Sequence, residues 1–127
     1  MARGTRERRL GQEVQRLLPE LIRSELKDPR VTGLITVTAV EVASDLSSAK
    51  VFVTVLGSPD ADATLEALNR GSAFLRSEVA QRLRARTVPS LRFVYDASVE
   101  RGVRLTRLIE SAVRDKPGGD KGGSGGV

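Results

Sequence analysis

The sequence predicts an α+β domain in which helices cover one face of a small sheet. Residues 5–26 and 60–86 carry apolar side chains at spacings of three and four, which is typical of amphipathic helices. Residues 34–43, 49–56 and 91–96 are rich in Val, Thr and aromatic residues and largely alternate in polarity, as strands do. The length of 127 residues suits one domain with one modest core.

The first helix is predicted from Thr5, a suitable N-cap, to Leu26. Pro19 lies inside its apolar pattern and cannot donate a backbone hydrogen bond, so we expect a kink or a local break near Leu18. The helix should end before Asp28 and Pro29, because a residue that precedes proline is disfavoured in the helical region. We expect a structural role for Asp28 and Pro29 in the turn that follows.

The first strand has an alternation that slips by one residue. Ile35 and Val37 share one phase, whereas Val40 and Val42 share the other. A bulge near Thr38-Ala39 would bring all four side chains to one buried face. The short segment 44–48 joins this strand to the next and predicts a hairpin.

The second helix, residues 60–86, contains a glycine where a good helix former is expected. Gly71 costs roughly 1 kcal/mol relative to Ala, and a Gly-Ser pair is a common cause of a sharp kink. The plainer interpretation is a tolerated glycine in an amphipathic helix. The functional one is a helix-kink-helix that admits a backbone or a phosphate closely, with arginines on both arms. The apolar stripe consists of Leu65, Leu68, Ser72, Leu75, Val79 and Leu83.

The aromatic side chains are few. Phe93 and Tyr95 alternate in the third strand and could form a base-stacking platform, although core packing is the better use for Phe93. Phe74, beside the kink, is expected in the core. A last, weaker helix is predicted from Ser98 to Val113. We therefore divide the chain into a domain at 1–110 and a flexible Gly-rich tail at 111–127.

The composition removes several classes of function. The chain has no Cys and no His, the commonest metal ligands and acid-base groups. No apolar run approaches the roughly 20 residues that a membrane span needs. We expect a cytoplasmic protein that is not an enzyme, with no catalytic residues, no metal and no cofactor. A Mg²⁺-dependent nuclease is the competing class, but its carboxylates would come from turns and strand ends, at no convincing spacing.

The net charge of +5 is concentrated in one segment. Residues 1–63 balance nine basic against nine acidic side chains, whereas residues 64–107 hold nine Arg and four acids. Arg suits bidentate phosphate contacts and stacking on bases. The clustering therefore favours a nucleic-acid partner.

Five blocks of the chain, taken in order, resemble the ribosome-binding factor A family. They are Glu-Leu-Lys-Asp-Pro-Arg-Val (25–31), Ile-Thr-Val-Thr (35–38), Asp-Leu-Ser-Ser-Ala-Lys-Val-Phe-Val (45–53), Phe-Leu-Arg-Ser-Glu-Val (74–79) and Arg-Thr-Val-Pro-Ser-Leu-Arg-Phe-Val-Tyr-Asp (86–96). The Gly-x-x-Gly loop that is usual in K-homology domains is absent between the helices. The family's Ala-x-Gly kink appears here in reverse order, as Gly71-Ser72-Ala73.

The resemblance implies a K-homology (KH) fold of type II, with a three-stranded sheet and the order α-β-β-α-kink-α-β. It implies a monomeric factor that binds the free 30S ribosomal subunit and 16S rRNA. The factor would assist late 16S rRNA maturation near the 5′ end, support growth in the cold and be linked functionally to assembly GTPases.

The candidate RNA-binding residues lie at the kink and beyond it, and would contact phosphate and sugar without reading base edges. They are Arg70, Gly71, Ser72, Ala73, Arg76, Arg82, Arg84 and Arg86, with Arg6, Arg9, Lys27, Arg30 and Arg92 as auxiliary candidates. The plainer interpretation is a solvated basic face, partly paired with acids on the same helices. A DNA-binding module that uses the two helix arms like a helix-turn-helix is a further alternative.

Overall fold

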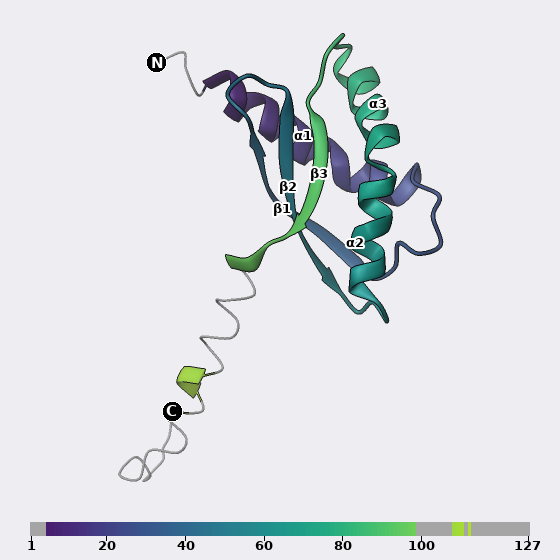
Figure 1. The fold of residues 1–127 in the computed structure, drawn as a ribbon, viewed down its shortest axis with the longest axis vertical. Helices are drawn as coiled ribbons and strands as arrows, with labels where there is room; N and C mark the ends of the chain where they lie inside the picture. Colours follow the sequence, from purple (N-terminus) through teal and green to yellow (C-terminus); the bar gives the residue numbers. More distant parts are fainter. Residues whose placement is uncertain (1–4, 99–107, 111, 113–127) are drawn as a thin grey trace. The chain divides into compact units, whose positions relative to one another are not determined.

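The computed structural model describes residues 5–98, 108–110 and 112, and the chain divides into two units, residues 1–95 and 96–127. The described part of the first unit holds six regular elements (Figure 1). They are α1 (Thr5–Ser24), β1 (Leu34–Val42), β2 (Ser48–Leu56), α2 (Ala61–Arg70), α3 (Ser72–Leu83) and β3 (Ser90–Tyr95). This order confirms the α+β class and matches the α-β-β-α-kink-α-β order. The predicted last helix and tail lie largely outside the described residues and stay predictions.

The sheet is mixed, with the strand order β1-β2-β3. β1 and β2 pair antiparallel, which confirms the predicted hairpin, and β2 and β3 pair parallel. Parallel neighbours require a crossover connection, and α2 and α3 provide it (Figure 1). β2 is the central strand of the sheet. The helices α2 and α3 come between β2 and β3 in the sequence.

The predicted bulge in β1 is confirmed. Val37 pairs with Val53, and the next pair is Ala39 with Phe52, so Thr38 is the extra residue. The Thr38 hydroxyl donates to the carbonyl oxygen of Phe52 at 3.2 Å. One inserted residue returns the strand to phase, and four side chains of β1 face the core as predicted: Ile35, Val37, Val40 and Val42.

Helix α1 is unbroken from Thr5 to Ser24, so the predicted local break at Pro19 is wrong, while a kink there stays a prediction. Leu18 and Leu21, on either side of the proline, have at most 1% of their surface exposed. Packing of this stripe holds the helix although one backbone hydrogen bond is missing. Gly11 is also buried, and a Cβ at that position would lie 3.0 Å from the carbonyl oxygen of Val40. The absent side chain lets α1 lie close against β1.

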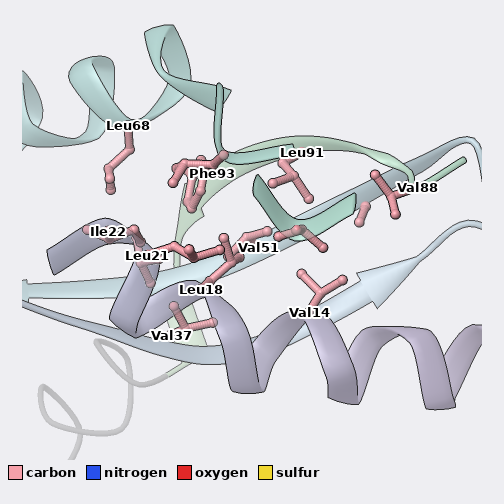
Figure 2. Close-up of a cluster of buried hydrophobic side chains, with 14 residues drawn as sticks. Val14, Leu18, Leu21, Ile22, Val37, Val51, Leu68, Val88, Leu91 and Phe93 are labelled. Atoms are coloured by element: carbon pink, nitrogen blue, oxygen red, sulfur yellow. The ribbon is translucent and has the colours of Figure 1, made fainter. Parts of the chain in front are cut away.

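The core lies between the sheet and the three helices (Figure 2). Phe93 of β3 is 1% exposed, which confirms the expectation that it packs in the core. It belongs to one core cluster with buried side chains of the three helices and the central strand: Val14, Leu18, Leu21, Ile22, Val51, Val53, Leu68, Leu75 and Val79. No helix in the described part of the chain is long and apolar enough to span a bilayer.

Candidate nucleic-acid interface

The helix pair is split at Gly71, as predicted. α2 ends at Arg70 and α3 begins at Ser72, and Gly71 has φ −88° and ψ 6°. This conformation is open to any residue, so backbone freedom does not explain the glycine. A Cβ on Gly71 would lie 2.7 Å from a methyl carbon of Leu26. The small residue therefore makes room for the Leu26 side chain, in the segment that leaves α1, and a phosphate contact at Gly71, Ser72 and Ala73 stays a prediction.

Two polar side chains attach the helix pair to β3. The Asn69 amide accepts from the Phe93 N–H at 2.8 Å and donates to the Phe93 carbonyl at 2.9 Å. Asn69 thus pairs with the edge of β3 that β2 leaves free. Arg76 donates from Nε to the carbonyl oxygen of Val88 at 3.0 Å. Arg76, a predicted phosphate contact, therefore also has a structural role in holding the segment that enters β3.

Thr64 has a structural role that the apolar periodicity of the helix does not reveal. Its side chain has no exposed surface. Its hydroxyl lies 3.0 Å from the Arg30 carbonyl oxygen and accepts from the Thr32 N–H at 3.2 Å. These bonds hold the loop between α1 and β1 against α2. The only sequence signal is that Thr64 stands four residues before Leu68, on the same helix face.

The arginines near the helix break are paired with acids. Arg30 makes a two-pronged ion pair with Asp28, with N–O distances of 3.0 and 2.9 Å. The Arg30 side chain, through these bonds, holds the pKa of Asp28 below its usual range, and the Arg30 N–H adds to the effect. Arg70 lies 3.8 Å from Glu66. The break therefore presents less free positive charge than the sequence indicates, and Asp28 has the structural role in the turn that we expected.

Arg82 is also paired, with Glu78 at 3.3 Å. Arg84 and Arg86, the next two arginines, have no ion pair in the described part of the chain. Arg84 ends α3 in the left-handed conformation, with φ 54°, and Arg86 lies in the loop to β3. Both are exposed, and neither has an ion pair or a side-chain hydrogen bond within the described part of the chain.

Five exposed arginines that have no ion pair within the described residues lie toward one end of the first unit. The loop after α3 enters β3 next to the β1–β2 turn, because Ser90 donates its N–H to the Ser47 carbonyl at 3.0 Å. The start of α1 lies at this same end (Figure 1). We call the exposed side chains Arg6, Arg8, Arg9, Arg84 and Arg86 the end cluster; they have no ion pair within the described ranges. Arg8 was not among the sequence candidates.

The predicted site therefore falls into two groups. Gly71, Ser72, Ala73, Arg70, Lys27 and Arg30 belong to the helix break, whereas Arg84 and Arg86 lie beyond the other end of α3. The helix α3, which has twelve residues and is about 18 Å long, runs from the first group to the second. Arg92 belongs to neither group, because it is exposed on the strand β3. Of the two groups, the arginines without an ion pair in the described part of the chain therefore lie beyond the far end of α3, whereas Arg30 and Arg70 at the helix break are paired with acids.

The aromatic residues are placed differently from the sequence expectation in one case. Phe74 is 42% exposed, so its predicted place in the core is wrong. It stands about 100° away from Leu75 around the helix, and Leu75 takes the buried position. Tyr95 donates its hydroxyl to a carboxylate oxygen of Asp62 at 2.8 Å, and with Phe93 buried these two residues form no exposed platform.

The acidic side chains of the described residues lie apart from one another or are used in local hydrogen bonds. Within residues 5–98, 108–110 and 112, no group of three potential ligands among His, Cys, Asp and Glu is found. Asp45 is used locally: the Ser47 hydroxyl, at 2.7 Å, and the Ser47 N–H hold the pKa of Asp45 below its usual range. This hydrogen bonding gives Asp45 a turn-forming role.

The split helix pair, the three-stranded mixed sheet and the unpaired arginines define a small α+β protein of the K-homology type with a basic end. The profile of the family described as ribosome-binding factor A matches residues 6–109. Ribosome-binding factor A of Thiobacillus denitrificans is 52% identical over 111 residues, which cover 87% of this chain and 89% of the relative. That of Azotobacter vinelandii is 51% identical over 115 residues, covering 87% and 88%. The chain belongs to the ribosome-binding factor A family.

Solved structures agree with this assignment. The crystal structure of ribosome-binding factor A from Thermus thermophilus superposes with a TM-score of 0.60 at 34% identity, covering 70% of this chain and 94% of that chain. A homology model of the Thermus thermophilus factor, fitted into a cryo-EM map of a complex of that factor with the 30S subunit, gives a TM-score of 0.58 at 34% identity, covering 69% and 92%. The α+β fold, with its three-stranded sheet and helices, therefore matches solved structures of the family.

Proposed function

We propose that this chain is a non-catalytic ribosome assembly factor that binds the free 30S subunit through 16S rRNA. Family membership supports the class of partner, because the related Thermus thermophilus factor was fitted into a map of its 30S complex. The observation that carries the proposal is the end cluster, whose arginines are exposed and lack ion pairs in the described part of the chain. Such side chains suit phosphate contacts that position a protein without reading sequence.

The finer role follows from the resemblance of the sequence to the family. The factor would act in the cytoplasm as a monomer during late maturation of 16S rRNA near its 5′ end, support growth in the cold and work alongside assembly GTPases. A sucrose gradient of cell extract tests the stage of action. The protein should travel with free 30S subunits, and migration with whole ribosomes would contradict this role.

Charge reversal tests the interface directly. Arg84→Glu with Arg86→Glu should weaken co-sedimentation with 30S subunits, because the variant replaces attraction to phosphates by repulsion. The salt dependence should also become shallower, by about 0.7 to 0.9 in log–log slope for each phosphate that is no longer neutralised. The matched control is Arg16→Glu with Arg23→Glu, two exposed arginines that pair with glutamates of their own helix. Equal binding by both variants, with each folded by circular dichroism, would overturn this interface.

Two further measurements separate the proposal from other classes. Duplex DNA should compete poorly with 30S subunits, and effective competition would favour the DNA-binding alternative. Incubation with precursor rRNA and Mg²⁺ should leave the RNA intact. Specific cleavage that co-purifies with the protein and is absent from a buffer control would make the protein an enzyme.

A further inference from the structure

The face of the sheet opposite the core has its own chemistry. In the strand register, Glu41, Lys50 and Arg92 form one row across β1, β2 and β3. Ala39, Phe52 and Val94 form the next row. We call these six residues the open face, because their neighbours in sequence, such as Val51 and Phe93, are the ones that point into the core. The core cluster with α1, α2 and α3 lies on the opposite side.

Phe52 is the aromatic residue of this face. It is half-buried between Ala39 and Val94, which flank it on the neighbouring strands. Of the other aromatics, Phe93 is in the core, Tyr95 shares the inward phase of Phe93, and Phe74 is on α3. Among the described residues, Phe52 is therefore the aromatic side chain that the sheet carries on its open face.

Two cations adjoin Phe52. Lys50 is two residues before Phe52 on β2, about 7 Å along the strand, and Arg92 is the register partner of Lys50 on β3. Both are exposed, and neither has an ion pair in the described part of the chain. Glu41 stands in register with Lys50 on the other side and is the acidic member of the row. The row thus has a net charge of +1 at the edge of a small apolar patch.

We propose that the open face is a second RNA site, which binds an unpaired nucleotide of a single strand. The base stacks on Phe52 and Val94, and the adjoining phosphate contacts Lys50 and Arg92. One nucleotide supplies a partner for each part of this face. Its base is flat and apolar and suits Phe52, whereas its phosphate is anionic and suits the two cations. A duplex does not offer the face of a base, because its bases are stacked inside. The site is distinct from the end cluster and gives the protein a contact to single-stranded RNA.

The test measures binding of a fluorescein-labelled, ten-nucleotide RNA of mixed sequence by fluorescence anisotropy, at fixed salt. Phe52→Ala should weaken binding by about 5- to 150-fold, the effect of removing one base–aromatic stack. Phe52→Tyr should restore it, because the ring remains. Leu56→Ala is the matched control, since Leu56 shares this side of β2 and is 62% exposed, but lies farther from the cations.

Charge variants test the phosphate contact. Lys50→Gln and Arg92→Gln should each weaken binding and make its salt dependence shallower, whereas Glu41→Gln should tighten binding by removing the nearby negative charge. A gain of affinity in a conservative variant cannot come from misfolding. Unchanged affinity in all three variants would overturn the phosphate contact and with it the proposal.

Three outcomes decide against the stacking site. Folded Phe52→Ala could bind the single strand as the wild type does. It could lose single-stranded and duplex RNA equally, which would indicate general electrostatics. It could keep RNA binding but lose 30S binding, which would indicate a protein contact on this face. Amide NMR shifts at residues 50, 52 and 94 on addition of the RNA to the wild-type protein would support the site without any substitution. Failure here leaves the 30S result with Arg84 and Arg86 unaffected, because those variants do not touch the open face.

Discussion

Asn69 holds the helix pair to the sheet, and Asn69→Ala should lower the free energy of unfolding by about 1.5 kcal/mol. The side chain makes two hydrogen bonds to the backbone of Phe93, at 2.8 and 2.9 Å. Loss of a partner costs about 1 to 3 kcal/mol per buried group left unpaired. Asn69 is only half-buried, so water can reach the freed groups, and about 1 kcal/mol for each is appropriate. Alanine returns about 0.5 kcal/mol through its better helix propensity.

Urea unfolding followed by far-ultraviolet circular dichroism measures this loss. With a slope of about 1 to 3 kcal/mol per molar urea, the midpoint should fall by roughly 0.5 to 1.5 M. Gln81→Ala is the control, because Gln81 is exposed on α3 and should change stability by less than about 0.5 kcal/mol.

Asn69→Asp provides a second variant of nearly the same shape. Its carboxylate can accept from the Phe93 N–H but cannot donate to the Phe93 carbonyl, so at neutral pH it should also destabilise the protein. If Asn69→Ala unfolds within about 0.5 kcal/mol of the wild type, the side chain does not pair with the edge of β3 in solution. The reasoning would then be refuted.

Three further predictions concern the helix break and its loop. Gly71→Ala and Leu26→Ala should couple favourably, by at least about 0.5 kcal/mol in a double-mutant cycle from urea unfolding. The reason is that Leu26→Ala removes the methyl group that a Cβ on residue 71 would meet at 2.7 Å. Simple additivity of the two changes would contradict the contact. Thr64→Val should lower the free energy of unfolding by about 1 to 3 kcal/mol in the same assay, because valine lacks the buried hydroxyl that bonds to the backbone of Arg30 and Thr32. A neutral effect would contradict these hydrogen bonds. The folded-state pKa of Asp28 is lowered, chiefly by the Arg30 side chain, so Asp28 stabilises above its unfolded pKa of about 3.9, and this contribution is lost as pH falls through the folded value. The urea midpoint of Asp28→Asn should therefore lie below that of the wild type at pH 7 and converge with it in acid; a constant difference would contradict the ion pair.

The sequence by itself determined the local structure of the first unit. Periodicity and turn residues placed α1, the hairpin, the split helix and β3, and the slipped alternation located the bulge at Thr38. These features depend on neighbours a few residues away, because a strand alternates every two residues and a helix repeats every 3.6. The five sequence blocks likewise indicated the family, which the match over residues 6–109 confirms.

Only the tertiary structure decided what each exposed or paired side chain does. Hydrophobicity alone placed Phe74 in the core, but the stripe of α3 that meets the sheet belongs to Leu75. A charge tally counted every arginine alike, whereas Arg30 is neutralised by Asp28 and Arg84 is free of ion pairs within the described residues. The tally could not separate them because it counts charges, whereas an ion pair needs a local conformation that brings the two side chains together, as the turn does for Arg30 and Asp28. Gly71 marked the helix break in the sequence, but Leu26 lies far from it along the chain, so only the structure showed that Leu26 occupies the space it leaves.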